Sequence, residues 1–343
     1  MYLIEPKRDG KWQDDPGIAM AIQDYAKNHI FLDEDILFIY TTQPSIQIGK
    51  YQNAYEEINQ TYMDAHNIKL VRRETGGGAI YLDNQNMSFC FLFNDNQEIY
   101  GNYKYLYQPV MEALNTMSVA QPEQKGRNDL LLNNKKISGA AMAVHKGRVH
   151  AGYSLLLDPD YEAMLAVLRP NQKKINSHGI QSVRSRVGAI RPHLAPEYKN
   201  ITVWEFTDVL LQHLLNIDDV QQAKRYELTR EDWKGIDEIA AEKYNNWDWN
   251  YGRFQQFEYQ VSKRFSIGTI HIGLKIIYAK ISDISITGDF FGTENIQDLE
   301  ATLIGVRLKK EELLKAISSI NIADYFNGIS KEEFIQFIME ENE

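Results

Sequence analysis

The first 250 residues alternate between amphipathic helical patterns and short apolar runs typical of strands. Asp15-Pro16 is typical of an N-cap followed by proline at the first helical position, and apolar residues then recur at helical spacing to about Phe31. The same spacing recurs further along the chain, and strands are predicted where short apolar or β-branched runs are bounded by turns. The predicted helices are 15–31, 103–117, 161–168 and 203–215, and the predicted strands are 36–40, 45–48, 69–72, 86–93, 130–132 and 148–157.

The order of these elements predicts an α/β (α+β) fold. Helices and strands interleave without a strict βαβ repeat, which favours a mixed sheet over a doubly wound parallel one. The composition changes within 245–252, and three strand-like segments (257–265, 268–278, 280–287) then precede two helical patterns (296–303, 310–317). About 90 residues are enough for a small separate domain. We therefore predict one domain over residues 1–250 and a small α+β domain over residues 251–343.

Composition narrows the class of protein. The chain has 343 residues, 43% hydrophobic and 24% charged, as in ordinary soluble proteins. A formal net charge of −10 argues against broad binding to nucleic acid. No apolar run is long enough to span a membrane and the start lacks a signal-peptide pattern, so we expect a cytoplasmic protein without a membrane partner. The single cysteine, Cys90, excludes an internal disulfide and a cysteine metal cluster.

The segment Arg72–Ala79 carries the strongest chemical signal. It places two arginines before three consecutive glycines, Gly76 to Gly78. Glycines let the backbone approach a ligand closely, successive backbone N–H groups can form an anion-binding nest, and arginines bind phosphate or carboxylate. The alternative is a glycine-rich turn with two solvated arginines. The segment is not a Walker loop, because no Gly-Lys-Ser/Thr closes it.

A second signal lies in Gly126–Leu130 and the following Lys135–Gly139, with a tight turn predicted at Asn133-Asn134. Asn and Asp oxygens after a glycine turn suit Mg²⁺, which takes few protein ligands. A lysine beside them can neutralise an oxyanion or a phosphate in a transition state. The alternative is a solvated hairpin tip. A third segment, Gly179–Val187, alternates Arg and Ser and can equally be an exposed charged stretch.

Taken together, these motifs resemble the lipoate–protein ligase family. Their order and spacing match over nearly the whole chain, including the small C-terminal domain. Several motifs in one order are far more specific than any single motif. The matching motifs are Ile48-Gly49, Gln52-Asn53, Glu56-Glu57-Ile58-Asn59, Arg72-Arg73, Gly76-Gly77-Gly78-Ala79, Asp83, Asn86, Gly126-Arg127-Asn128-Asp129, Lys136-Ile137-Ser138-Gly139, Ser182-Val183-Arg184-Ser185-Arg186-Val187 and Trp249-Asn250-Tyr251-Gly252, with Trp247 before the last.

The resemblance implies an activity and its partners. Family members activate lipoic acid with ATP to form lipoyl-AMP and pyrophosphate. They then transfer the lipoyl group to a lysine of a lipoyl domain or of a glycine-cleavage H-type protein. For this chain it implies a catalytic lipoate- and ATP-binding domain over 1–250, related to the biotin and lipoate ligase core, with 251–343 as an accessory domain. ATP, Mg²⁺ and lipoate are the expected ligands, and a monomer is the expected state.

The resemblance also assigns roles to matching residues. Lys136 would be catalytic, contacting the acyl carbonyl and the α-phosphate. Asp129 would hold Mg²⁺, and Arg72 would lie near the phosphate and carboxylate end. Adenylation brings two anions together, and a metal, a lysine and glycine-loop amides are suited to offset their repulsion. The residues implied to bind substrate or ATP are Arg72, Gly76, Gly77, Gly78, Ala79, Asn86, Asn128, Asp129, Ser138 and Gly139.

The lipoyl tail is apolar, so its pocket should be a narrow apolar slot. Candidates for its walls are Leu70, Ile80, Phe89 and Phe91. Each of these residues can equally be plain core.

Several positions depart from the common family pattern. Small polar groups are lost at two of them, and buried partners left unpaired would cost roughly 1–3 kcal/mol each. We interpret the chain as a divergent but working ligase, with two alternatives: a non-catalytic or redirected lipoyl-binding paralogue, and an ATP-independent octanoyl or lipoyl transferase acting through Cys90. The departures are Lys50-Tyr51, Leu82, Gln85, Ser88, Ala140, Ala151, Tyr153 and His178.

Overall fold

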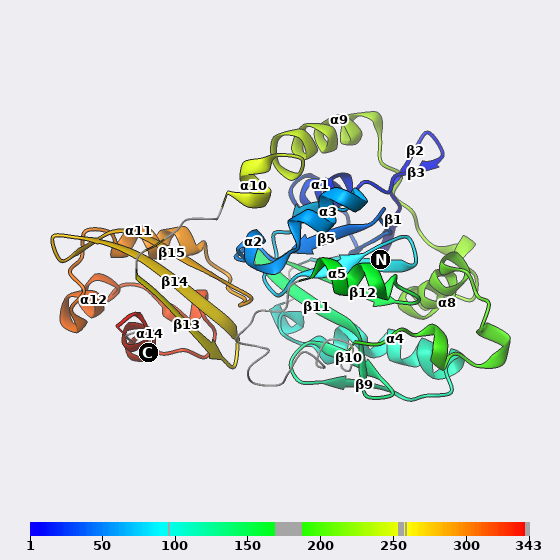
Figure 1. The fold of residues 1–343 in the computed structure, drawn as a ribbon. Coiled ribbons are helices and arrows are strands. Elements are labelled where there is room, and N and C mark those ends of the chain that lie inside the picture. The colour runs from blue at the N-terminus through cyan, green and yellow to red at the C-terminus, as the bar shows by residue number, and fades with distance from the viewer. Residues whose placement is uncertain (95–96, 169–186, 253–256, 258, 340–343) are drawn as a thin grey trace. The chain divides into compact units, whose positions relative to one another are not determined.

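The computed structural model describes residues 1–94, 97–168, 187–252, 257 and 259–339 (Figure 1). The chain forms two compact units. The large unit consists of Met1–Gln47, Glu57–Val71 and Ile80–Asn246, and the small unit consists of Ile48–Glu56, Arg72–Ala79 and Trp247–Glu343. The small unit therefore contains two segments from inside the N-terminal part of the sequence. The functional division predicted at residue 250 stays a prediction.

A seven-stranded sheet forms the centre of the large unit. Its first two strands are parallel and all other neighbours are antiparallel. The prediction of a mixed α/β sheet is therefore confirmed. In spatial order the strands are β1 (Tyr2–Ile4), β4 (Ile36–Tyr40), β8 (Asn86–Phe93), β12 (Arg148–Leu156), β11 (Lys135–His145), β10 (Asp129–Leu132) and β9 (Pro122–Lys125).

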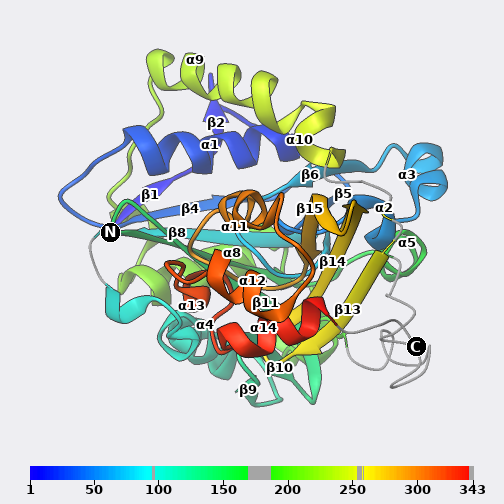
Figure 2. The same ribbon diagram turned by 90° about the vertical axis from the view of Figure 1, so that its left-hand side faces the viewer.

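Helices cover both faces of this sheet. In Figure 2, α1 (Pro16–His29) and α9 (Arg230–Ile239) lie on one face, and α4 (Tyr103–Met117) and α8 (Val203–Leu215) lie on the other. Asp15 caps α1 by accepting a hydrogen bond from the Ile18 amide, as Asp-Pro at this position predicts. All eight residues of β8 are buried, because helices pack on both of its faces.

Shorter elements surround the large sheet. A second sheet has the order β6-β5-β7, and β2 and β3 form a hairpin. A π-helix, Ala240–Tyr244, follows α9. None of the helices in the described part of the chain is both long and apolar enough to cross a membrane. The shorter elements are β2 (Lys7–Arg8), β3 (Lys11–Trp12), β5 (Ser45–Ile48), α2 (Ala54–Glu57), α3 (Gln60–His66), β6 (Lys69–Arg72), β7 (Ile80–Leu82) and α5 (Tyr161–Val167).

The small unit has its own sheet and its own apolar core. Its antiparallel strands are β13 (Tyr259–Phe265), β14 (Gly268–Ile277) and β15 (Lys280–Gly288). Phe290, Phe326 and Phe334 are fully buried in the core with the inward side chains of the sheet. The helices are α10 (Trp247–Tyr251), α11 (Ile296–Leu303), α12 (Lys310–Ala316), α13 (Ile322–Tyr325) and α14 (Lys331–Ile338).

The segment Ile48–Glu56 is attached to this core through Tyr51. The Tyr51 ring stacks on Phe290 with centroids 4.7 Å apart and an interplanar angle of 7°. The amide of Gly288 donates to the Tyr51 carbonyl at 2.9 Å, and the Tyr51 hydroxyl donates to the Glu294 carbonyl at 3.3 Å. These contacts explain why a segment from the N-terminal part of the sequence belongs to the small unit.

Arg72 connects all three segments of the small unit. Its side chain is completely buried. Nη1 donates to the carbonyls of Gly49, Lys50 and Gln52 at 3.0, 3.2 and 2.6 Å. On the other side, Nε donates to the Trp249 carbonyl at 2.9 Å and Nη2 to the Asn250 carbonyl at 2.8 Å. Only the guanidinium of arginine, which is planar and permanently charged and has five N–H donors, can donate to so many carbonyls at once.

We predict that Arg72→Lys destabilises the protein by about 3 kcal/mol or more. Lysine has no fork, so several buried carbonyls would lose their donor, at roughly 1–3 kcal/mol each. Urea unfolding followed by circular dichroism measures the loss. Arg264→Lys, an exposed arginine of the same unit, is the matched control and should change stability by less than about 0.5 kcal/mol. Equal effects of the two substitutions would contradict the prediction.

Candidate active site

Lys136 and Asp129 come together in the hairpin formed by β10 and β11. The predicted turn at Asn133-Asn134 is confirmed, with φ of 50° and 61°, values that asparagine tolerates well. Lys136 Nζ lies 2.7 Å from Asp129 Oδ1, and the two side chains are 40% and 39% exposed. The pair is therefore accessible to a ligand, and the lysine ammonium lies against the carboxylate.

Gly139 makes room for the lysine. It lies opposite Asp129 in the strand register. A Cβ atom on Gly139 would lie 3.0 Å from Lys136 Nζ and 3.1 Å from its Cε, closer than nearly all real Cβ contacts. Its φ is not in the left-handed region, so a methyl group here would shift the end of the lysine side chain and would not strain the backbone.

Asn128 and Ser138 fix the frame of this hairpin. Asn128 Nδ2 donates to the Ala140 carbonyl at 2.7 Å, and the Ala140 amide donates to the Asn128 carbonyl at 2.9 Å. The buried Tyr107 hydroxyl lies 3.1 Å from both the Asn128 carbonyl and Ser138 Oγ. Burial raises the pKa of Tyr107 above its ordinary value, so the hydroxyl remains a neutral donor. Tyr107 is not among the predicted site residues, although its position on the apolar face of a predicted helix was a signal.

Asn86 and Asp83 form a second polar cluster in the large unit. Asp83 Oδ1 accepts hydrogen bonds from the Gln85 amide and from Asn86 Nδ2, both at 2.9 Å, and Oδ2 accepts from the Asp160 amide at 2.9 Å. Burial raises the pKa of the Asp83 carboxyl, and the donated backbone hydrogen bonds partly oppose this shift. Asn86 Oδ1 is buried with no hydrogen-bond partner among the described residues. It is an acceptor that a ligand donor could satisfy.

The triple-glycine segment belongs to the small unit, where it packs tightly. A Cβ atom on Gly76 would lie 2.2 Å from the Phe290 carbonyl oxygen, and the Gly77 amide donates to that same oxygen at 3.4 Å. Gly77 has a φ of 92°, which favours glycine. Arg73 Nη2 donates to the carbonyls of Gly76 and Gly78 at 2.9 and 2.7 Å. Of the three glycines, Gly78 alone has open space around it, since an added Cβ there would meet nothing within 4 Å.

The predicted site residues therefore form separate groups. The lysine, the aspartate and Gly139 touch one another, and Asn128 and Ser138 share the hydroxyl of Tyr107. Arg72 and the glycine segment belong to the small unit, and Arg72 binds backbone carbonyls, as described above. The ligand-binding roles of all these residues stay predictions.

The Arg/Ser motif lies almost entirely outside the described residues, which resume at Val187. Val187 pairs with Lys136 in an isolated parallel bridge, and the Gly188 amide donates to the Lys136 carbonyl at 2.9 Å. The end of this motif therefore lies beside the lysine hairpin. The predicted role of residues 179–186 stays a prediction.

Cys90, the candidate nucleophile of the transferase alternative, is buried in β8. Its Sγ lies 3.0 Å from His150 Nε2, and a cysteine beside a histidine is the usual pair in thiol catalysis. The thiol is only 3% exposed, however, and burial raises its pKa above the ordinary value. A buried, protonated thiol behaves as a small hydrophobe.

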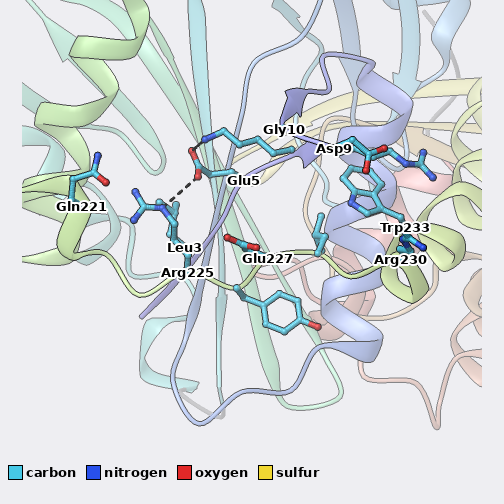
Figure 3. A pocket seen from close by; sticks show the side chains of 13 residues that line it. Leu3, Glu5, Asp9, Gly10, Gln221, Arg225, Glu227, Arg230 and Trp233 are labelled. Carbon is cyan, nitrogen blue, oxygen red and sulfur yellow. Dashed lines mark hydrogen bonds and ion pairs between the residues drawn. The ribbon is translucent and has the colours of Figure 1, made fainter.

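An open polar pocket of about 850 Å³ lies elsewhere in the large unit (Figure 3). It is lined by the β2–β3 hairpin and the chain before α9. Within it, Glu5 pairs with Lys7 at 3.0 Å and with Arg225 at 3.5 Å. None of the predicted site residues that the structure describes lines this pocket. Its paired charges give no chemical reason to place the reaction there.

Two departures from the family pattern, Ala140 and Tyr153, lie directly opposite each other on β11 and β12. Directly opposite side chains in an antiparallel pair share a face of the sheet. The Tyr153 ring packs against Phe89, Phe91 and Tyr107, with centroids 5.3–5.7 Å apart. Its hydroxyl is buried without a partner in the described part of the chain. The small side chain at position 140 thus lies opposite the large one at position 153 and makes part of the room that the tyrosine needs.

Comparisons with known proteins agree with this architecture. The protein-family model of the lipoyl protein ligase A/B catalytic domain matches residues 15–215. The family model of the bacterial lipoate protein ligase C-terminus matches residues 255–338. Lipoate–protein ligase 2 of Staphylococcus aureus is 48% identical over 99% of this chain and 100% of its own length. The lipoate–protein ligase of Streptococcus pyogenes is 50% identical over 97% of this chain and 98% of its own.

Solved structures show the same fold. Plasmodium falciparum LipL1 in complex with lipoate has a TM-score of 0.76 at 20% identity and covers 99% of both chains. A lipoate–protein ligase A bound with ATP has a TM-score of 0.58 at 24% identity, over 73% of this chain and 98% of that one. The chain belongs to the lipoyl protein ligase A/B family. Its activity is that of a lipoate–protein ligase.

We predict that Gly139→Ala lowers the rate of lipoate adenylation by about tenfold or more, because the new methyl group displaces the Lys136 ammonium and small displacements of this kind are costly. Lipoate-dependent exchange between pyrophosphate and ATP measures the rate. The thermal midpoint is the control, and it should hold or rise because glycine weakens strands. A variant with full exchange activity would contradict the assigned role of Gly139.

We predict that Ala140 and Tyr153 are energetically coupled. Ala140→Asn alone should cost about 1–3 kcal/mol through overpacking, and Tyr153→Thr alone about 3 kcal/mol through a cavity. In the double variant the asparagine occupies part of the cavity, so the total should fall short of the sum by about 1 kcal/mol or more. Urea unfolding of the four proteins gives the coupling free energy. Additivity to within about 0.5 kcal/mol would argue against compensation.

Proposed function

We propose that Lys136, held by Asp129 over Gly139, is the catalytic residue of this lipoate–protein ligase. The observation that carries the proposal is the 2.7 Å contact between Nζ and Asp129 Oδ1 on an exposed hairpin. The carboxylate limits the rotamers of the lysine and so fixes the position of its charge. A fixed ammonium is the group that adenylation needs, because it favours an anionic transition state without reorganising first.

The first half-reaction joins two anions. A carboxylate oxygen of lipoate attacks the α-phosphorus of ATP, the bond to the β-phosphate breaks, and pyrophosphate leaves. Lys136 would lie between the acyl carbonyl and the α-phosphate and offset their repulsion. Asn128, Ser138 and Tyr107 would keep the hairpin rigid while the charge moves, since their hydrogen bonds hold β11 in place.

Asp129 also fits the role of a Mg²⁺ ligand. The ion commonly takes one or two carboxylates and completes its shell with substrate phosphates and water, and the Asp129 side chain is 39% exposed and carries a hard oxygen donor. When bound, Mg²⁺ neutralises phosphate charge and aligns the leaving pyrophosphate. Asp129 would then be shared between the ion and Lys136.

The second half-reaction transfers the lipoyl group to protein. A lysine amine of the acceptor attacks the acyl carbonyl, the bond to AMP breaks, and the amine loses a proton. Lys136 would polarise the carbonyl and stabilise the oxyanion that forms. The acceptor we propose is an H-type protein or a dehydrogenase lipoyl domain, with the enzyme acting as a monomer. The buried thiol of Cys90 gives no support to an acyl-enzyme route.

We expect Lys136→Ala to abolish lipoylation. The assay contains purified enzyme, ATP, Mg²⁺ and lipoate, with one H protein or one dehydrogenase lipoyl domain as acceptor, and mass spectrometry detects the lipoyl group. Removing the ammonium should reduce both pyrophosphate release and transfer by about a hundredfold or more. Lys135→Ala, the exposed neighbour on the same strand, is the matched control and should retain activity.

The outcomes separate the alternatives. Wild-type enzyme that binds lipoate but neither releases pyrophosphate nor modifies an acceptor would favour a binding module. Transfer from an octanoylated donor without ATP, lost in Cys90→Ser, would favour the transferase. Retention of full activity in Lys136→Ala would overturn the assignment of that residue.

A further inference from the structure

The hairpin between β14 and β15 has an unusual turn. Four two-residue hairpin turns in the described chain place both residues at positive φ. Each of three of them contains at least one residue suited to that conformation, Gly, Asn or Asp: Asp9-Gly10, Asn133-Asn134 and Lys146-Gly147. The fourth is Tyr278-Ala279, with φ of 50° and 62°. Tyrosine and alanine are unfavourable in the left-handed region, so folding alone does not explain their presence.

The tyrosine is turned to solvent. Its side chain is 96% exposed, and the neighbouring Ile277 is 45% exposed. Ile304, 49% exposed, lies beside the hairpin, because the Gly305 amide donates to the Ile281 carbonyl at 2.7 Å and the Ile281 amide donates to the Val306 carbonyl at 2.8 Å. We use the name hairpin patch for Ile277, Tyr278 and Ile304 together with five nearby basic residues, Lys275, Lys280, Arg307, Lys309 and Lys310.

Basic residues outnumber acidic ones around these apolar side chains, although Asp283 lies opposite Lys275 in the strand register and Glu311 and Glu312 follow Lys310. Lys275 and Lys280 lie on the hairpin, and Arg307 pairs with Lys280 in an isolated bridge that leads to Lys309 and Lys310. All five cations are exposed. Within the described part of the chain, the four lysines form no ion pair, and Arg307 has only a long contact of 3.7 Å to Glu312. This cluster stands out on a chain of formal net charge −10.

We propose that the hairpin patch docks the acidic surface of the lipoyl-acceptor protein. An exposed tyrosine within a basic rim is a typical recognition element, because tyrosine supplies contact area at low entropic cost and the rim attracts an acidic partner. The inference rests on the proposed function, since the acceptor is the macromolecule on which a ligase must act.

The test uses full-length enzyme with Tyr278→Asn and with the double variant Lys280→Glu/Lys309→Glu. Asparagine suits the turn, so Tyr278→Asn should fold with an equal or higher thermal midpoint. The matched control is Lys104→Glu/Lys234→Glu, which makes the same charge change at exposed lysines of the large unit. The readouts are acceptor affinity by fluorescence anisotropy, the KM for acceptor, and lipoate-dependent pyrophosphate exchange, with one H protein and one dehydrogenase lipoyl domain as acceptors.

The proposal predicts a rise of about tenfold in Kd and KM for at least one acceptor in both patch variants, with pyrophosphate exchange and the control unchanged. Unchanged Kd and KM for both acceptors would overturn it, as would an equal loss of exchange. Loss of sedimentation with phosphatidylserine vesicles at unchanged acceptor Kd would instead assign the patch to lipid. Absence of exchange in the wild-type enzyme would refute the proposed function, and the anisotropy measurement would still decide on docking.

Discussion

The buried guanidinium of Arg72 is the interaction on which the small unit depends. Five backbone carbonyls from two distant segments converge on it. Carbonyls that face one another in a core repel, so these segments could not meet without a multiple donor between them. A permanently charged, planar side chain supplies this donor at no cost in protonation. In this structure, the arginine next to the glycine loop therefore holds together the backbone segments that surround the loop.

The Lys136 hairpin follows a different logic. Lys136 provides a positive charge and Asp129 the carboxylate that pairs with it. Gly139 has no side chain and so leaves room for the lysine. Their arrangement is intact even though several neighbouring positions depart from the family pattern. Ala140 and Tyr153 show how such departures are tolerated, since they lie opposite each other on neighbouring strands and the small side chain makes part of the room that the tyrosine needs. The departures thus mark a repacked wall beside an intact lysine hairpin, which agrees with the ligase identity of the full-length relatives.

Much of the fold could be predicted from the sequence, because its strongest elements carry local signals. The helices at 103–117, 203–215 and 296–303 match their predicted bounds, as does the strand at 86–93. The pairing of Lys136 with Asp129 could not be predicted, because it depends on the hairpin register and its bulge. The assignment of Arg72 and the glycines to the small unit could not be predicted either. The glycine segment packs against the carbonyl of Phe290, which is distant in the sequence, and motif spacing does not indicate such a contact.

The composition of the small unit has a consequence for how this protein can be divided. A C-terminal fragment that begins at Trp247 would lack Tyr51, whose ring stacks on Phe290, and would lack Arg72, the donor that binds the carbonyls of Trp249 and Asn250. The complementary fragment would carry Arg72 without two of its five carbonyl acceptors. The two units are therefore not separable by a single break in the chain, and any recombination between related ligases would have to exchange residues 48–56 and 72–79 together with the C-terminal part.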